Sequence, residues 1–188
     1  MHPKHPLDWE RIHTKYVLNE RWIKVRADDF KMPNGNVISP FYVLEYPDWV
    51  NAVAITEDKQ VILTKLFRPG IGATVLELPS GSVDPNESPE QTIQRELLEE
   101  TGYFFDQIIH LSTCAPNPAN QNNLVHGFLA LNGVKKQAQQ LDESEQIELV
   151  MLSLDEFIEL LNKNQLIQAM HVTAGHYALQ KLQELGWI

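Results

Sequence analysis

Short apolar segments bounded by turn residues predict β-strands through most of the first eighty residues. The expected strands cover residues 15–25, 37–44, 50–56, 60–66 and 75–78. The first two flank the segment Met32-Pro33-Asn34-Gly35-Asn36, whose Asn-Gly pair tolerates positive φ. We therefore expect an N-terminal antiparallel β-hairpin.

The spacing of apolar positions becomes helical at residue 88, which predicts a helix over 88–101. Ser88 suits the N-cap, Pro89 the first helical position, and Gln91 completes a capping box. Gly102 supplies the stop signal. Further strands are expected at 108–112, 124–131 and 148–152, and further helices at about 154–162 and 167–185. The pattern indicates a mixed α/β (α+β) sandwich with one central helix.

Length and composition favour one large domain with at most an appendage. The chain has 188 residues, of which 43% are hydrophobic and 21% charged, an ordinary globular composition. No stretch approaches the about 20 apolar residues that cross a bilayer, so no membrane partner is expected. The single cysteine, Cys114, cannot form an internal disulfide, which fits a reducing compartment. We expect a soluble, cytoplasmic protein.

The net charge of −10 disfavours a nucleic-acid partner, because such proteins grip phosphates with an excess of cationic side chains. An acidic protein that binds an anion needs a cation to mediate the contact. The charge balance therefore directs attention to possible metal ligands.

Three glutamates of the predicted central helix, Glu96, Glu99 and Glu100, are spaced three and four residues apart. At about 100° per residue they share one side of a helix and repel one another. They form either a solvated acidic face or a site for a divalent cation, and Mg²⁺ or Mn²⁺ prefers such oxygen ligands. Zinc is not favoured, since the seven histidines show no ligand spacing.

The context of these glutamates decides between the two interpretations. The pattern G-x5-E-x7-R-E-L-x-E-E-x-G-Y resembles the Nudix box at every position, in Gly81, Glu87, Arg95, Glu96, Leu97, Glu99, Glu100, Gly102 and Tyr103. The resemblance implies a Nudix α/β/α sandwich with a mixed β-sheet, and hydrolysis of a nucleoside diphosphate linked to another group. It also implies that the Gly81 carbonyl, Glu96, Glu99 and Glu100 bind metal, and that Glu87 pairs with Arg95.

Segments outside the box resemble the ADP-ribose and nucleoside-diphosphate-sugar pyrophosphatase branch of that family. The resemblance implies four substrate-binding residues: Arg68 for the diphosphate, Tyr46 or Trp49 for stacking on a base, and Pro118 in a polar loop. It also implies that residues 1–44 form an N-terminal segment and hairpin that serves dimerisation, followed by a catalytic domain over 45–188. A homodimer is therefore expected.

The acidic segment 142–148 precedes the last predicted strand and resembles the loop that supplies the catalytic base in this branch. Glu145 is the first candidate and Glu143 the second, with Glu100 a further catalytic carboxylate. The most favoured substrate is ADP-ribose or a related nucleotide-sugar. The alternatives are a GDP-sugar or dinucleoside polyphosphate hydrolase, and a sensor that binds a nucleotide-sugar without cleaving it.

Overall fold

The computed structural model describes residues 5–21 and 23–188 and contains two compact units. The first unit comprises Met1–Tyr46 together with Ala115–Asn123, and the second comprises Pro47–Cys114 together with Leu124–Ile188. The first four residues of the predicted N-terminal segment and Trp22 lie outside the described residues. Within the described residues, no helix is long and apolar enough to cross a membrane.

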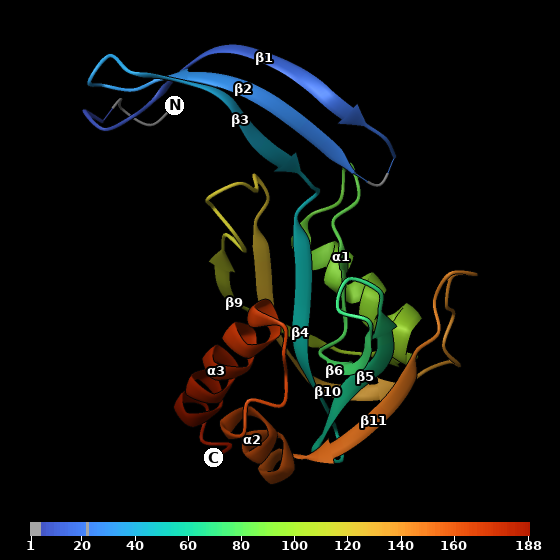
Figure 1. Ribbon diagram of the computed structural model, residues 1–188. Coiled ribbons are helices and arrows are strands. Elements are labelled where there is room, and N and C mark those ends of the chain that lie inside the picture. The colour runs from blue at the N-terminus through green and yellow to red at the C-terminus, as the bar shows by residue number, and fades with distance from the viewer. Residues whose placement is uncertain (1–4, 22) are drawn as a thin grey trace. The chain divides into compact units, whose positions relative to one another are not determined.

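The first unit is built on an antiparallel sheet of three strands, β1 (Glu10–Asn19), β2 (Lys24–Lys31) and β3 (Val37–Glu45) (Figure 1). The turn between β2 and β3 has Gly35 at a φ of +88°, so this part of the predicted hairpin is confirmed. The single strand predicted over 15–25 is wrong. The chain turns back between Asn19 and Lys24, where Glu20 N–H donates to the Ile23 carbonyl oxygen at 3.0 Å. No glycine or proline marks this turn.

Aromatic and charged side chains hold the three-stranded sheet together. Trp9, Phe30 and Phe41 meet edge to face, with ring centroids 5.9–6.2 Å apart. Asp28 is fully buried and accepts a hydrogen bond from Arg26 Nε at 2.8 Å. Many other large apolar side chains on these strands stay exposed: Ile12, Tyr16, Val17, Leu18, Val37 and Tyr42.

The polar loop 115–123 lies along the end of β3 in the same unit. Leu44 N–H donates to the Asn120 carbonyl oxygen at 2.8 Å, and Tyr46 N–H donates to Asn122 Oδ1 at 3.1 Å. These bonds satisfy backbone groups that the end of a strand otherwise leaves without partners. The loop therefore completes the first unit although about seventy residues separate it from β3 in sequence.

The second unit contains a mixed sheet of eight strands. The central path runs β11-β5-β4-β10-β8, with β6 beside β5, β7 beside β4 and β9 beside β10. The pair β4–β10 is parallel and the other pairs are antiparallel. The strands are β4 (Trp49–Thr56), β5 (Gln60–Arg68), β6 (Ala73–Glu77), β7 (Ser80–Ser82), β8 (Tyr103–Phe104), β9 (Gln107–Cys114), β10 (Val125–Lys135) and β11 (Glu148–Ser153).

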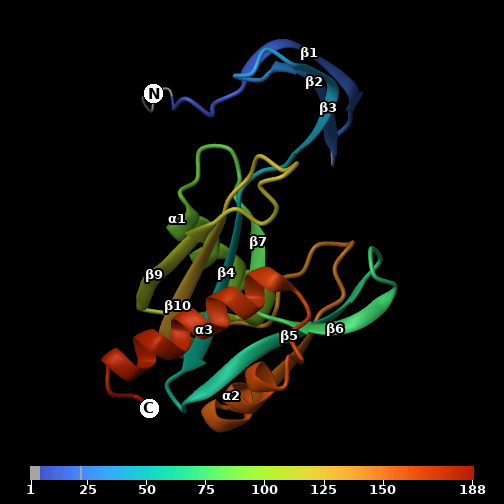
Figure 2. The ribbon, with the colours of Figure 1, turned by 60° about the vertical axis from the view of Figure 1, so that its left-hand side comes forward.

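Helices cover both faces of this sheet (Figure 2). Along β4, Val53 and Ile55 pack in a core with α2 (Leu154–Asn162) and α3 (Ala169–Glu184), whereas Ala52 and Ala54 pack with α1 (Pro89–Glu96). Successive residues of a strand point to opposite faces, so a strand that is buried along its length needs a cover on each side. The predicted α/β/α sandwich is confirmed.

The central helix starts as the sequence indicates. Ser88 Oγ accepts from Gln91 N–H at 3.3 Å, and Gln91 Oε1 accepts from Ser88 N–H at 2.9 Å, which completes the capping box. Gly102 ends the helical segment with a φ of +77°. The helical segment extends to Thr101 as predicted, but its last turn, η1 (Leu97–Thr101), is π-helical and not α-helical. There the Thr101 hydroxyl donates to the Leu97 carbonyl oxygen, a contact that apolar spacing does not reveal.

Candidate active site

A cavity of about 980 Å³ opens in the second unit between the end of β5, β7, η1 and the first turn of α3. Its volume lies at the upper end of the range for cofactor and ligand sites, which suits a dinucleotide-sized molecule. The lining includes two cationic residues, Lys65 and Arg68, and the acidic residues Glu100, Glu145 and Glu148. Trp49 and Phe67 add aromatic surface. Positive, negative and aromatic groups thus meet in one concave site.

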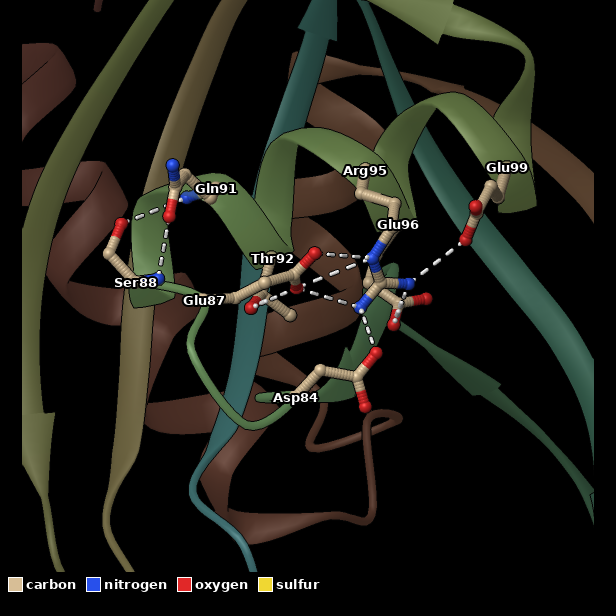
Figure 3. Close-up of polar contacts among 8 residues, drawn as sticks. All are labelled: Asp84, Glu87, Ser88, Gln91, Thr92, Arg95, Glu96 and Glu99. Carbon is tan, nitrogen blue, oxygen red and sulfur yellow. Dashed lines mark hydrogen bonds and ion pairs between the residues drawn. The ribbon is translucent and has the colours of Figure 1, made fainter.

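Arg95 organises the carboxylates around α1 (Figure 3). Its Nη2 lies 3.2 Å from Glu87 Oε2, and its Nη1 lies 2.9 Å from Glu96 Oε1 and 3.0 Å from Glu99 Oε2. Asp84 approaches the same guanidinium at 3.6 Å. One planar cation therefore connects the loop before the helix to two of the box glutamates.

Glu96 lies directly against the backbone of Gly81. A Cβ placed on Gly81 would come within 2.1 Å of the Glu96 carboxyl group, so only glycine fits there. Burial raises the pKa of Glu96 to about 7, although the positive charge of Arg95 opposes the shift. This close approach places the backbone of β7 against the buried carboxyl group of Glu96.

Glu100 is the most buried of the box glutamates, with 7% of its surface exposed. Its Oε2 accepts a hydrogen bond from Ser80 N–H at 3.0 Å. Burial raises its pKa to about 8 against the opposing effect of that bond, and the charges of Glu96 and Glu145 raise it further. Negative charge is therefore unfavourable at this position unless a cation approaches.

The donor set around Glu100 fits a hard divalent cation, because it consists of carboxylates and a backbone carbonyl and includes two carboxyl groups with raised pKa values. In the arrangement described for residues 5–21 and 23–188, however, no three acidic, histidine or cysteine side chains converge closely enough to hold an ion. Arg95 contacts the carboxylates of Glu96 and Glu99 instead. Two expected ligands are thus paired with an internal cation.

The structure separates the two candidates for the catalytic base by position. Glu145 lines the cavity, whereas Glu143 is not among the described residues that do so. Glu145 Oε2 accepts from Asp142 N–H at 3.1 Å, which closes the acidic loop into a turn. The negative charge of Glu145 also contributes to the raised pKa values of Glu96 and Glu100.

The four expected substrate residues fall in different units. Arg68 and Trp49 line the cavity, whereas Tyr46 and Pro118 belong to the first unit. Arg68 forms a bidentate ion pair with the buried Glu77, at 2.8 Å from Nε to Oε1 and 2.6 Å from Nη2 to Oε2. Sequence reasoning missed Glu77, although a lone acidic residue at the end of an apolar strand is a usable signal.

Sequence reasoning also missed the contribution of α3. Gln168, the N-cap of α3, and Met170 in its first turn line the cavity. Neither residue stands in a motif, and more than sixty residues separate them from the box. Only the packing of α3 against the sheet brings them to the site.

Comparison with known proteins agrees with this geometry. The model of the NUDIX domain matches residues 45–171, and that of the nucleoside diphosphate sugar hydrolase N-terminal domain matches residues 9–44. The chain is 31% identical to the methanol dehydrogenase activator of Bacillus methanolicus over 92% of both chains. It is 30% identical to the ADP-ribose pyrophosphatase of Bacillus subtilis over 94% of both.

A solved structure described as an ADP compounds hydrolase has the same fold, with a TM-score of 0.86 at 22% identity, over 99% of this chain and 100% of the other. The matched NUDIX region contains the loop, helix and turn that carry Gly81, Arg95 and the three glutamates. From the family match and the site geometry together, we conclude that the chain belongs to the Nudix family and is a Nudix pyrophosphatase.

Proposed function

We propose that this enzyme hydrolyses the pyrophosphate bond of ADP-ribose or a related nucleotide-sugar, giving a nucleoside monophosphate and a sugar phosphate. The observation that supports this is the cavity, which combines the box carboxylate of Glu100, the cationic side chains Lys65 and Arg68, and the aromatic rings of Trp49 and Phe67. A diphosphate suits the cations, and a base can stack on a ring. Relatives named ADP-ribose pyrophosphatase favour the adenosine compound.

The reaction is proposed to require a divalent cation, Mg²⁺ with Mn²⁺ as a substitute. The Gly81 carbonyl oxygen and the carboxylates of Glu96, Glu99 and Glu100 would hold it. When bound, the cation stabilises the negative charge that develops on the phosphate oxygens during hydrolysis. Release of Glu96 and Glu99 from Arg95 is then the local change that ion binding requires.

The remaining roles belong to the side chains of the cavity wall. Arg68 binds the diphosphate through the face of its guanidinium group that Glu77 leaves free, and Glu77 orients it. Glu145 accepts the proton of the attacking water from its position on the acidic loop. Glu143 is the second candidate for this role. Buried Glu100 is held in place by Ser80 N–H.

The function is tested by incubating the purified chain with ADP-ribose, ADP-glucose, GDP-mannose, NADH and diadenosine polyphosphates, with Mg²⁺ or with a chelator. We expect AMP and ribose phosphate from ADP-ribose, and no product with the chelator. Preferred cleavage of GDP-mannose or of a diadenosine polyphosphate would replace the proposed substrate. Tight binding without any product would favour the sensor alternative.

We propose that the protein is a homodimer and that the three-stranded sheet forms the interface between the two copies. In support, apolar side chains such as Ile12, Val17 and Val37 are at least half exposed on it, although a small sheet rarely leaves so much apolar surface in water. Sedimentation should give a dimer for the natural chain and a monomer for Val17→Asp. A monomeric natural chain would contradict the proposal.

A further inference from the structure

We infer that Gln168, at the start of α3, is a specificity-determining residue. Its side-chain carbonyl oxygen accepts a hydrogen bond from a hydroxyl or amino group on the uncharged part of the substrate. This inference rests on the proposed hydrolysis of a nucleotide-sugar, and it assigns to the C-terminal helix a part in substrate choice. No motif in the sequence points to it.

The first observation is an unsatisfied acceptor at the cavity. Gln168 lines the cavity, and its Oε1 is buried without a hydrogen-bond partner among the described residues. A buried carbonyl oxygen without a partner is unfavourable, and native proteins pair nearly all such groups with protein, water or ligand. Rotation of the Gln168 side chain toward the cavity would let a donor from the substrate satisfy Oε1 in the bound state.

The second observation is that helix capping does not explain this side chain. Gln168 occupies the N-cap of α3, where Ser, Thr, Asp or Asn is preferred, yet its side chain makes no capping bond. The backbone carbonyl of Gln168 accepts the first helical bonds, from His171 N–H at 3.0 Å and Val172 N–H at 3.2 Å. A shorter side chain at this position therefore leaves the helix start intact.

The third observation is that the first turn of α3 is anchored to β4 and to the segment between β6 and β7. His171 is fully buried, and its Nδ1 accepts from Leu78 N–H at 2.8 Å. The Met170 carbonyl oxygen accepts from Asn51 Nδ2 of β4 at 3.4 Å. Leu78 stands two residues before Ser80, which lines the same cavity. The anchored turn fixes the position of Gln168, as a specificity contact requires.

Hydrogen-bond chemistry decides which part of the substrate can satisfy Oε1. The diphosphate carries acceptor oxygens only, so it cannot donate to Oε1, and its charge is matched by Lys65 and Arg68. The donors of a nucleotide-sugar are the hydroxyl groups of its sugars and the amino group of its base. These two sources share one hydrogen-bond chemistry and can be separated by choosing the substrate.

The test compares Gln168→Ala with the natural chain on three substrates. IDP-ribose replaces the 6-amino donor of ADP-ribose with a carbonyl group, and ADP-glucose changes the pattern of sugar hydroxyls. Steady-state kcat/KM is measured with Mg²⁺, and dissociation constants are measured by calorimetry without metal. The matched control is Gln165→Ala, an exposed glutamine three residues earlier and outside the cavity lining.

We expect Gln168→Ala to unfold at the same temperature as the natural chain and to lose about tenfold in kcat/KM on the preferred substrate. Loss of the ADP-ribose preference over IDP-ribose assigns the bond to the base. Loss of discrimination between ADP-ribose and ADP-glucose, with the preference over IDP-ribose retained, assigns it to a sugar hydroxyl. Gln165→Ala should change neither ratio.

Two results would overturn the inference, and they have different meanings. If Gln168→Ala affects all three substrates equally, or none of them, Gln168 does not select the substrate and its carbonyl is satisfied by water. In that case the proposed function stands. If the natural chain neither binds nor cleaves any of the three nucleotides, the proposed function fails and the inference fails with it.

Discussion

Arg68 and Glu77 form a bidentate ion pair at the wall of the cavity. Glu77 is 2% exposed, whereas Arg68 retains contact with water. The two residues lie on neighbouring strands, β5 and β6, at opposite ends of that pairing, so their side chains reach each other along the strands. A planar guanidinium held at two nitrogens has a defined orientation. The pair therefore presents a fixed cation to any anion in the cavity.

Replacing Glu77 with Gln should weaken both substrate binding and folding. The amide keeps the shape and one hydrogen bond but removes the charge, so Arg68 loses its fixed orientation. We expect KM to rise about tenfold with a smaller change in kcat, and the free energy of unfolding to fall by about 1–2 kcal/mol. Steady-state kinetics and urea denaturation measure the two effects.

The control for this substitution is Glu159→Gln, which breaks the exposed pair of Glu159 and Lys163 on α2. An exposed pair of this kind contributes at most about 0.5 kcal/mol. If Glu77→Gln proves as mild as Glu159→Gln in both measurements, the orienting role of Glu77 is wrong.

Replacing either Glu99 or Glu100 with Gln should reduce turnover by about two to four orders of magnitude. The substitution removes a negative charge and little volume, so the fold should remain intact. Turnover is measured over a range of Mg²⁺ concentrations, and circular dichroism checks the fold. Glu90→Gln, on the exposed first turn of α1, is the matched control and should retain full activity. Undiminished turnover at saturating Mg²⁺ would refute the assigned ligands.

Glu145→Gln should reduce kcat by about 100-fold or more with nearly unchanged substrate binding, because an amide cannot accept a proton from water. Glu143→Gln should have little effect, since only Glu145 of the two lines the cavity. Pre-steady-state kinetics separate the chemical step from binding. The opposite ranking of the two variants would transfer the role to Glu143.

His171 should make folding stability depend on pH. Burial lowers the pKa of His171 to about 4 from its ordinary value of 6.5. Between these values the unfolded chain binds a proton that the folded chain does not, so this residue makes stability fall as the pH decreases from about 6.5 to 4. The full effect corresponds to about 3 kcal/mol.

The test is His171→Asn, which retains an acceptor for Leu78 N–H but does not titrate. Urea denaturation of both proteins at several pH values should give a smaller decrease for His171→Asn, whatever its stability at pH 7. Parallel curves from pH 7 to pH 4.5 would show that His171 titrates normally in the folded chain.

The sequence predicted most elements of the second unit and the composition of the box, because those signals are local. Short apolar runs indicated β4 and β5, and Ser88, Pro89 and Gln91 indicated the start of α1. The start of β2 and the π-helical turn were missed. Each depends on particular hydrogen bonds that compete with regular secondary structure. A short segment of sequence does not show which of the two prevails.

The amino-acid order alone determined the family and the central helix with its glutamates, and it predicted a divalent cation beside them. Tertiary structure decided that Arg95 pairs with Glu96 and Glu99, that Glu77 holds Arg68, and that α3 brings Gln168 to the cavity. The features that the sequence determined follow from the spacing of residues along the chain, since a motif spans few residues. Most of the features that tertiary structure decided follow from packing, because residues far apart in the chain meet only when both faces of the sheet are covered.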